Sequence, residues 1–421
     1  MYRKAKLDNG IRVVYEAMPY VHSVALGIWV RTGSRDETEK NHGISHFIEH
    51  LLFKGTAKRT AKQIAEEIEA VGGVLNAFTT KEYTCFYARV LAEHLDLAID
   101  ILSDMLFNSL FTEEDIEREK NVILEEIRMY EDSPDELVHD LFAQTIWPGH
   151  PLGRAILGTY TSVAGLQRED ILNYYQKQYN ASNLVLAVAG KIEENEVLDK
   201  LATAFGQRRL PGEVSIHVPP VERAAVNNAV KDTEQVQICL GTPGLSQEDS
   251  QAYTMQVLNS ILGGGVSSRL FQDIREEKGL AYAIYSYHTS YSDTGLFTIY
   301  AGTSPANCRE VISSILNQIR LLKTNGITER ELQRTKDQIR GNLLLGMENV
   351  SQRMSRLGKT ELCFNRVITA EEVIENIKRV KVEDVKLLAE QLYKGENFAL
   401  ATLGPQKEEI DLDALLADAG L

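Results

Sequence analysis

Cysteine is scarce in this sequence, and its scarcity excludes two classes of protein. The 421 residues contain only Cys85, Cys239, Cys308 and Cys363, and no CxxC pair. A zinc ribbon or a small disulfide-bonded scaffold would need paired or closely spaced cysteines. We therefore expect free thiols in a protein that works in a reducing compartment.

The sequence also lacks an excess of positive charge and a long apolar run. Acidic residues outnumber basic ones by 60 to 45, which gives a formal charge of −15. Nucleic acids and anionic membranes attract the opposite balance, so we expect neither as a partner. No apolar run approaches the roughly 20 residues that span a bilayer. The first residues, MYRKAKLDNG, lack the apolar stretch of a signal peptide. We therefore expect a cytoplasmic protein.

What is present is typical of a globular protein with more than one domain. Apolar residues make up 43% of the sequence and charged residues 25%, as in average soluble proteins. A chain of this length is too long for one compact core. Residue periodicity predicts an edge strand at the start of the chain and a short helix at its end. Between them it predicts strands over 11–17 and 23–34 and helices over 61–73, 91–107 and 112–130. Thr112 is expected to be the N-cap of the last of these helices.

An internal repeat defines the domain organisation. TEEDIEREKNVI from Thr112 matches TERELQRTKDQI from Thr328. The segment from Arg168 to Gly190 matches a segment that begins at Val382. The two matches are separated by nearly the same length of chain, so we predict two homologous α+β domains over 1–209 and 221–421, joined by a Pro- and Gly-containing stretch. Each domain is expected to be a mainly antiparallel sheet packed with helices.

The first half contains the sequence His46-Phe47-Ile48-Glu49-His50. On a helix, His46 and His50 project from one face, with Glu49 beside them. Two imidazoles in this arrangement suit zinc, and the carboxylate is placed to activate a water; the pattern is the inverse of HExxH. The alternative is a pair of ordinary surface or core histidines. The apolar flanking residues indicate a buried helix, where unpartnered histidines would be costly, and this favours the metal.

A third metal ligand is expected on a second helix. The stretch from Glu117 carries Glu119 and Glu126 two helical turns apart on one face, while Glu125 points elsewhere. Glu126 could reach the metal, and Glu119 could orient a histidine. Acidic residues on a helix are usually a solvated face, and spacing alone does not choose among these carboxylates.

These motifs resemble the pitrilysin/insulinase family of zinc peptidases. The resemblance rests on HFIEH, on the spacing of Glu119 and Glu126, and on GGVLNAFTTKEYTCFYARV from Gly72, and it covers the whole chain. The chain is most similar to the short members, such as the bacterial processing-type peptidases and the catalytic subunit of the mitochondrial processing peptidase. The resemblance implies that His46, His50 and Glu126 bind one Zn²⁺ per chain. It also implies that Glu49 is the general base and that Glu119 orients a ligating histidine.

The resemblance also implies a substrate-binding edge. Asn76 and Ala77 match the strand edge along which an extended peptide adds in the family. Such addition uses main-chain hydrogen bonds and tolerates many sequences.

The second half has lost the metal motif. The repeat places Asn342 opposite Glu126 and Thr335 opposite Glu119. The segment from Ile261 instead carries Gly263, Gly264 and Gly265, followed by Arg275 and Tyr282. The resemblance implies that the glycines handle substrate entry and that Arg275 and Tyr282 contact the substrate and polarise its carbonyl. Without it, the glycines indicate a helix terminus and Arg275 an ordinary surface charge.

The expected function is therefore that of a zinc metalloendopeptidase acting on unfolded peptides or presequence-like segments. Longer family members carry four such domains and this chain has two, so the resemblance implies a homodimer in which Arg275 and Tyr282 act across the interface. A heteromeric partner is the alternative. A non-catalytic scaffold or assembly subunit of the same fold is the rival function, and a metal-storing protein is disfavoured because Glu49 would have no role.

Overall fold

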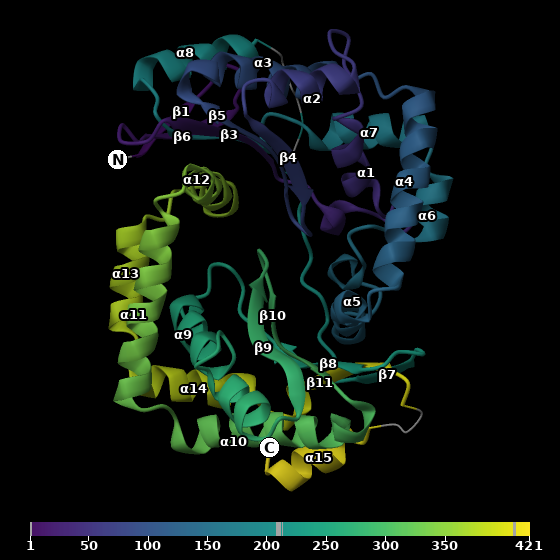
Figure 1. Cartoon of the computed structure of the whole chain (residues 1–421), viewed down its shortest axis with the longest axis vertical. Helices are drawn as coiled ribbons and strands as arrows, with labels where there is room; N and C mark the ends of the chain where they lie inside the picture. The colour runs from purple at the N-terminus through teal and green to yellow at the C-terminus, as the bar shows by residue number, and fades with distance from the viewer. Residues whose placement is uncertain (1, 208–211, 213, 407–409) are drawn as a thin grey trace. The chain divides into compact units, whose positions relative to one another are not determined.

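The computed structural model describes residues 2–207, 212, 214–406 and 410–421, and its strands form two sheets (Figure 1). Each sheet belongs to its own unit. The first unit comprises the described residues within Met1–Arg128, Ala155–His217 and Leu344–Ile368, and the second those within Met129–Arg154, Val218–Leu343 and Thr369–Leu421. Residues 1, 208–209 and 407–409 of the predicted ranges 1–209 and 221–421 lie outside the described part.

The first unit contains a sheet in the order β1-β2-β6-β3-β5-β4. β2 and β6 run parallel, and the other neighbouring pairs run antiparallel. The strands are β1 Tyr2–Lys6, β2 Arg12–Ala17, β3 Ser23–Val30, β4 Val74–Thr79, β5 Thr84–Leu91 and β6 Leu184–Gly190. The helices are α1 Ile44–Leu51, α2 Ala61–Glu69, α3 Leu95–Asn108, α4 Glu113–Glu131, α6 Tyr160–Gly165, α7 Arg168–Gln178, α8 Glu194–Phe205 and α12 Val350–Phe364.

Alternation along β3 gives this sheet two buried faces. Leu26 and Ile28 join the core that includes residues of α1, α3 and α8, whereas Ala25 and Trp29 join a second core with α12. Figure 1 shows α3 and α8 on one side of the sheet and α12 on the other. The sheet is therefore covered on both faces.

The second unit repeats this plan with a sheet in the order β7-β11-β8-β10-β9. β7 and β11 run parallel, and the remaining neighbours run antiparallel. The strands are β7 Val226–Val230, β8 Val236–Pro243, β9 Ala281–Ser290, β10 Gly295–Thr303 and β11 Ala399–Gly404. The helices are α5 Pro134–Ile146, α9 Ala252–Leu262, α10 Cys308–Asn325, α11 Glu329–Gly346, α13 Ala370–Arg379, α14 Val382–Leu392 and α15 Leu412–Ala419.

The two units exchange an equivalent helix. α5 belongs to the first repeat but packs on β8 and β11 of the second unit, and α12 belongs to the second repeat but packs on β3 and β6 of the first. Their first residues, Pro134 and Val350, are separated by the same length of chain as Thr112 and Thr328 of the sequence repeat. The contact of α12 with its sheet is close: a Cβ on Gly358 would lie 2.1 Å from Nε1 of Trp29. The units are therefore not the contiguous halves of the sequence.

The other elements follow the sequence expectations in type, although β3 ends at Val30 rather than at residue 34 and α2 ends at Glu69 rather than at residue 73. Mainly antiparallel sheets packed with helices are confirmed. Thr112 caps α4, since its Oγ1 accepts the N–H of Asp115 at 3.1 Å, and α15 is the expected terminal helix. α3 begins at Leu95 rather than at residue 91, because the residues before it form a single 3-10 turn. None of the helices in the described part is both long and apolar enough to cross a membrane.

Candidate metal centre

Helix α1 places two histidines and a glutamate together. Phe47, Ile48 and Leu51 are buried in the core of the first unit, and this packing fixes which way the helix faces. The imidazole rings of His46 and His50 have centroids 4.6 Å apart and lie at 67° to each other. The predicted projection of both rings from one helix face is thus observed.

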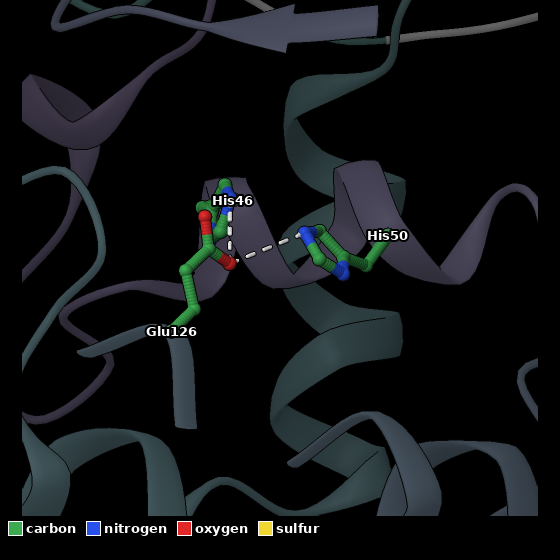
Figure 2. A group of neighbouring side chains, drawn as sticks. All are labelled: His46, His50 and Glu126. Carbon is green, nitrogen blue, oxygen red and sulfur yellow. Dashed lines mark ion pairs between the residues drawn. The ribbon is translucent and has the colours of Figure 1, made fainter. Parts of the chain in front are cut away.

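Glu126 reaches this histidine pair from α4. Its Oε2 lies 3.8 Å from Nε2 of His46 and 3.7 Å from Nε2 of His50, so one carboxylate oxygen faces both rings (Figure 2). One ligand atom from each residue falls within 4.8 Å of the other two. Glu125 instead pairs with Arg128. The structure therefore places Glu126, and not Glu125, beside the two histidines, a choice that spacing alone did not make.

The donor set fits a divalent metal ion. Burial lowers the pKa of His46 to about 3, and the neighbouring His50 adds to the shift, so the His46 ring is neutral and keeps a lone pair for coordination. Nδ1 of His46 is buried and has no hydrogen-bond partner among the described residues. Two imidazoles and a carboxylate are ligands that zinc commonly takes in sites that keep one position open.

Glu119 contacts His50 at Nδ1, the ring nitrogen that does not face Glu126. Its Oε2 lies 3.2 Å from Nδ1 of His50, and its Oε1 lies 2.8 Å from Nζ of Lys54. Glu119 is 2% exposed. A carboxylate on Nδ1 fixes the ring orientation and leaves Nε2 free to face Glu126. Sequence reasoning missed Lys54, although its place one helical turn beyond His50 was a usable signal.

Glu49 is oriented by the end of β4. Oγ1 of Thr79 donates a hydrogen bond to Oε2 of Glu49 at 2.5 Å. Burial raises the pKa of Glu49, with Thr79 and His50 opposing the rise and Glu126 adding to it. A raised carboxyl pKa moves Glu49 toward the range in which a group can take up and release a proton near neutrality. Sequence reasoning missed Thr79, because no local pattern links it to Glu49.

The strand that leads to Thr79 lies at the edge of its sheet. β4 is the last strand in the sheet order and pairs with β5 on one side. Asn76 is exposed and Ala77 is half-buried on this strand, and Oδ1 of Asn76 accepts the N–H of Ala77 at 2.8 Å. An edge strand presents main-chain groups that can pair with another extended chain.

The predicted residues of the second half lie in the second unit. Gly263 is the C-cap of α9, as the helix-terminus alternative expected, and a Cβ there would lie 2.3 Å from the backbone nitrogen of Ser286. Gly264 and Gly265 follow it and are exposed. None of the three has a positive φ. At Gly263, the close approach to β9 is what requires glycine.

Arg275 and Tyr282 lie side by side. Cζ of Arg275 is 5.4 Å from the ring centroid of Tyr282, and Tyr282 is 77% exposed. Thr335 is buried and Asn342 is exposed on α11. The repeat positions of Glu119 and Glu126 therefore carry no carboxylate.

Comparisons with known proteins agree on one family. Residues 12–160 match the family described as insulinase (peptidase family M16), and residues 165–339 match the peptidase M16 inactive domain. The uncharacterized zinc protease YmxG of Bacillus subtilis (strain 168) is 44% identical over 96% of this chain and 98% of its own length. An uncharacterized zinc protease of Streptomyces coelicolor (strain ATCC BAA-471 / A3(2) / M145), SCO5738, is 42% identical over 97% and 90%.

Solved structures share the fold at low sequence identity. A protease from Helicobacter pylori superposes with a TM-score of 0.89 at 22% identity and covers 96% of this chain and 99% of its own. A chain of complex III2 from Candida albicans superposes with a TM-score of 0.84 at 20% identity and covers 99% of both chains. At such identities these likenesses describe the fold alone.

Proposed function

Because the chain belongs to the insulinase family of peptidases (peptidase family M16), we propose that it hydrolyses peptide bonds with one zinc ion held by His46, His50 and Glu126. The observation that carries the proposal is the convergence of two Nε2 atoms from α1 and one Oε2 atom from α4. Three protein ligands leave the fourth position of a tetrahedral ion free for a water or a substrate.

The chemistry divides between the metal and the chain. A zinc ion bound there would supply a Lewis acid. Glu49, next to His50 in sequence and held by Thr79, takes a proton from the attacking water and then passes it to the leaving amine. Arg275 and Tyr282 present hydrogen-bond donors suited to the negative charge that develops on the scissile carbonyl oxygen.

The substrate we propose is an unfolded peptide or a presequence-like segment. An extended chain would pair with β4 along Asn76 and Ala77, and this strand ends at Thr79, which bonds Glu49. Pairing along the strand therefore leads the peptide toward the proposed base. Main-chain pairing gives affinity without demanding one sequence. Gly263, Gly264 and Gly265 are proposed to serve substrate entry.

We further propose a homodimer in which each metal centre receives Arg275 and Tyr282 from the partner. The metal cluster and the Arg275–Tyr282 pair belong to different units, so a second copy can supply the pair. Mixing Glu49→Gln chains with Arg275→Ala chains should restore activity, because one site in each mixed dimer has an intact set. Confirmed mixed dimers without activity would contradict this arrangement.

The Glu49→Gln variant tests the catalytic proposal. It should bind one zinc per chain like the wild type and lose turnover of an unstructured peptide, because the amide cannot accept a proton at neutral pH. Near-normal cleavage by this variant would refute the role of Glu49.

A non-catalytic assembly subunit is the second candidate, since the fold occurs in a chain of complex III2. The intact His46-Glu49-His50 pattern and the position of Glu126 beside both histidines argue against it. Peptide cleavage that a chelator abolishes and zinc restores would exclude this candidate. Absence of cleavage by the zinc-loaded protein would favour it.

A further inference from the structure

Helix α1 begins at a residue that has no side chain with which to cap it. Its N-cap is Gly43, which has a φ of 94° and no side chain. A Cβ at this position would lie 2.7 Å from the carbonyl oxygen of Leu157. The residues that usually cap helices, serine, threonine, aspartate and asparagine, would be strained there. The first N–H groups of α1 therefore need acceptors from elsewhere in the chain.

Glu37 supplies those acceptors from outside the helix. Its Oε2 accepts the N–H of Gly43 at 2.8 Å, and its Oε1 accepts the N–H of Ser45 at 2.8 Å. Glu37 is 3% exposed. A carboxylate at this end also matches the positive end of the helix dipole. One buried side chain thus satisfies two N–H groups in the turn that carries His46.

A buried hydroxyl network connects this cap to the body of the unit. Oγ of Ser45 lies 2.9 Å from Oη of Tyr174 on α7, and Oη of Tyr174 lies 3.0 Å from Oγ1 of Thr32, just beyond the end of β3. All three side chains are buried. Buried polar networks in which the members are satisfied hold their groups in one arrangement. The start of α1 is therefore tied to both α7 and the end of β3.

We propose that Glu37 is a positioning residue that holds the first turn of α1, and with it His46, in register with Glu126. This inference rests on the proposed zinc site. α1 is short, running only from Ile44 to Leu51, so a shift or fraying of its first turn moves one ligand out of three. The shift would weaken zinc binding through His46 and lower turnover through Glu49. It would not change the β4 edge, where the substrate is proposed to bind.

The test replaces Glu37 by glutamine and compares three readouts with the wild type. The amide keeps one acceptor and turns an NH₂ group toward the other backbone N–H. Zinc affinity, measured by competition with a chelator, should weaken about tenfold or more. The kcat should fall while KM stays within about twofold. Amide hydrogen exchange should accelerate in the peptide that covers residues 43–47.

Glu361→Gln is the matched control. Glu361 is a carboxylate of the same unit that is 1% exposed and pairs with Lys4 at 2.7 Å. The same substitution should lower the melting temperature and leave zinc affinity within about twofold of the wild type. If Glu37→Gln does not fold, Tyr174→Phe replaces it, because the change removes only the hydroxyl that bonds Ser45. That variant should weaken zinc binding about threefold.

Three results distinguish a failure of this inference from a failure of the proposed function. If the wild type binds zinc and Glu37→Gln binds it equally well with unchanged exchange over residues 43–47, the inference is overturned and the proposed function stands. If Tyr174→Phe stands in for it, unchanged zinc affinity overturns the inference in the same way. A wild type that binds no zinc at all overturns the proposed function and this inference with it.

Discussion

Replacing Glu119 by glutamine removes a single negative charge between His50 and Lys54. The wild-type carboxylate accepts from Nδ1 of His50 at 3.2 Å and from Nζ of Lys54 at 2.8 Å. Glutamine has one acceptor oxygen for these two donors, so one donor is left facing the NH₂ group. The side chain is almost fully buried, and water cannot readily fill the gap. We expect His50 to lose both its orientation and some of its basicity.

The size of the effect follows from these contacts. Removing a group that hydrogen-bonds a ligating histidine typically weakens metal binding about 10- to 100-fold, or about 1.4–2.7 kcal/mol. Because the Lys54 ammonium is also left without its anionic partner, we place Glu119→Gln in the upper half of this range. Stability should fall as well, by about 1–3 kcal/mol for a buried donor left unpaired.

The assay is zinc competition with a chelator of known affinity at fixed pH, on wild type and variant. Glu125→Gln is the control, because Glu125 lies on the same helix and pairs with Arg128 at the surface. It should leave zinc affinity within about twofold. If Glu119→Gln bound zinc as tightly as Glu125→Gln, the role given to Glu119 would be wrong.

Two further predictions concern stability. Burial lowers the pKa of His217, but its hydrogen bonds outweigh burial and raise the pKa from 6.5 to about 9; the hydrogen bond to the Asp36 carboxylate contributes most. The stability that this pKa shift adds is fully present below about pH 6.5 and is lost as the pH rises through about 9. Urea unfolding should therefore show His217→Gln less stable than wild type by about 2 kcal/mol near pH 7 and equal to it near pH 10, and a difference that does not change with pH would contradict the assignment. Gly358→Ala should destabilise the chain by about 1–3 kcal/mol, because its Cβ would lie 2.1 Å from Nε1 of Trp29. Gly341→Ala on α11, where an added Cβ would meet no atom within 4 Å apart from the adjacent backbone of its own helix, should stabilise it by up to about 1 kcal/mol. Equal thermal shifts in the two variants would refute the packing argument.

The local part of the metal centre was predictable from sequence, and its remote part was not. The His46–His50 pair follows from helix periodicity alone, since residues four apart share a face. Glu126 lies far along the chain on another helix, and only the family resemblance favoured it over Glu125 and Glu119. Glu37 was missed because it stands in a polar stretch, SRDETEKNHG, that has the composition of a solvated loop. Its burial comes from tertiary packing on α1, which no local pattern reports.

The repeat predicted two similar sheets but not which helix covers each. α5 and α12 occupy equivalent positions in the two repeats. An apolar helix face shows that a helix is buried and does not name its partner sheet. Sequence alone does not say which sheet α5 or α12 covers, so the contiguous ranges 1–209 and 221–421 were a reasonable expectation. The contacts assign α5 to the second unit and α12 to the first.

The most direct measurement is anomalous diffraction from crystals of the zinc-loaded protein, recorded on both sides of the zinc absorption edge. We predict one zinc peak per chain, bonded to Nε2 of His46, Nε2 of His50 and a carboxylate oxygen of Glu126, at about 2.0–2.2 Å from each. No peak at this cluster in zinc-loaded crystals, or a peak bound by other side chains, would contradict the central claim.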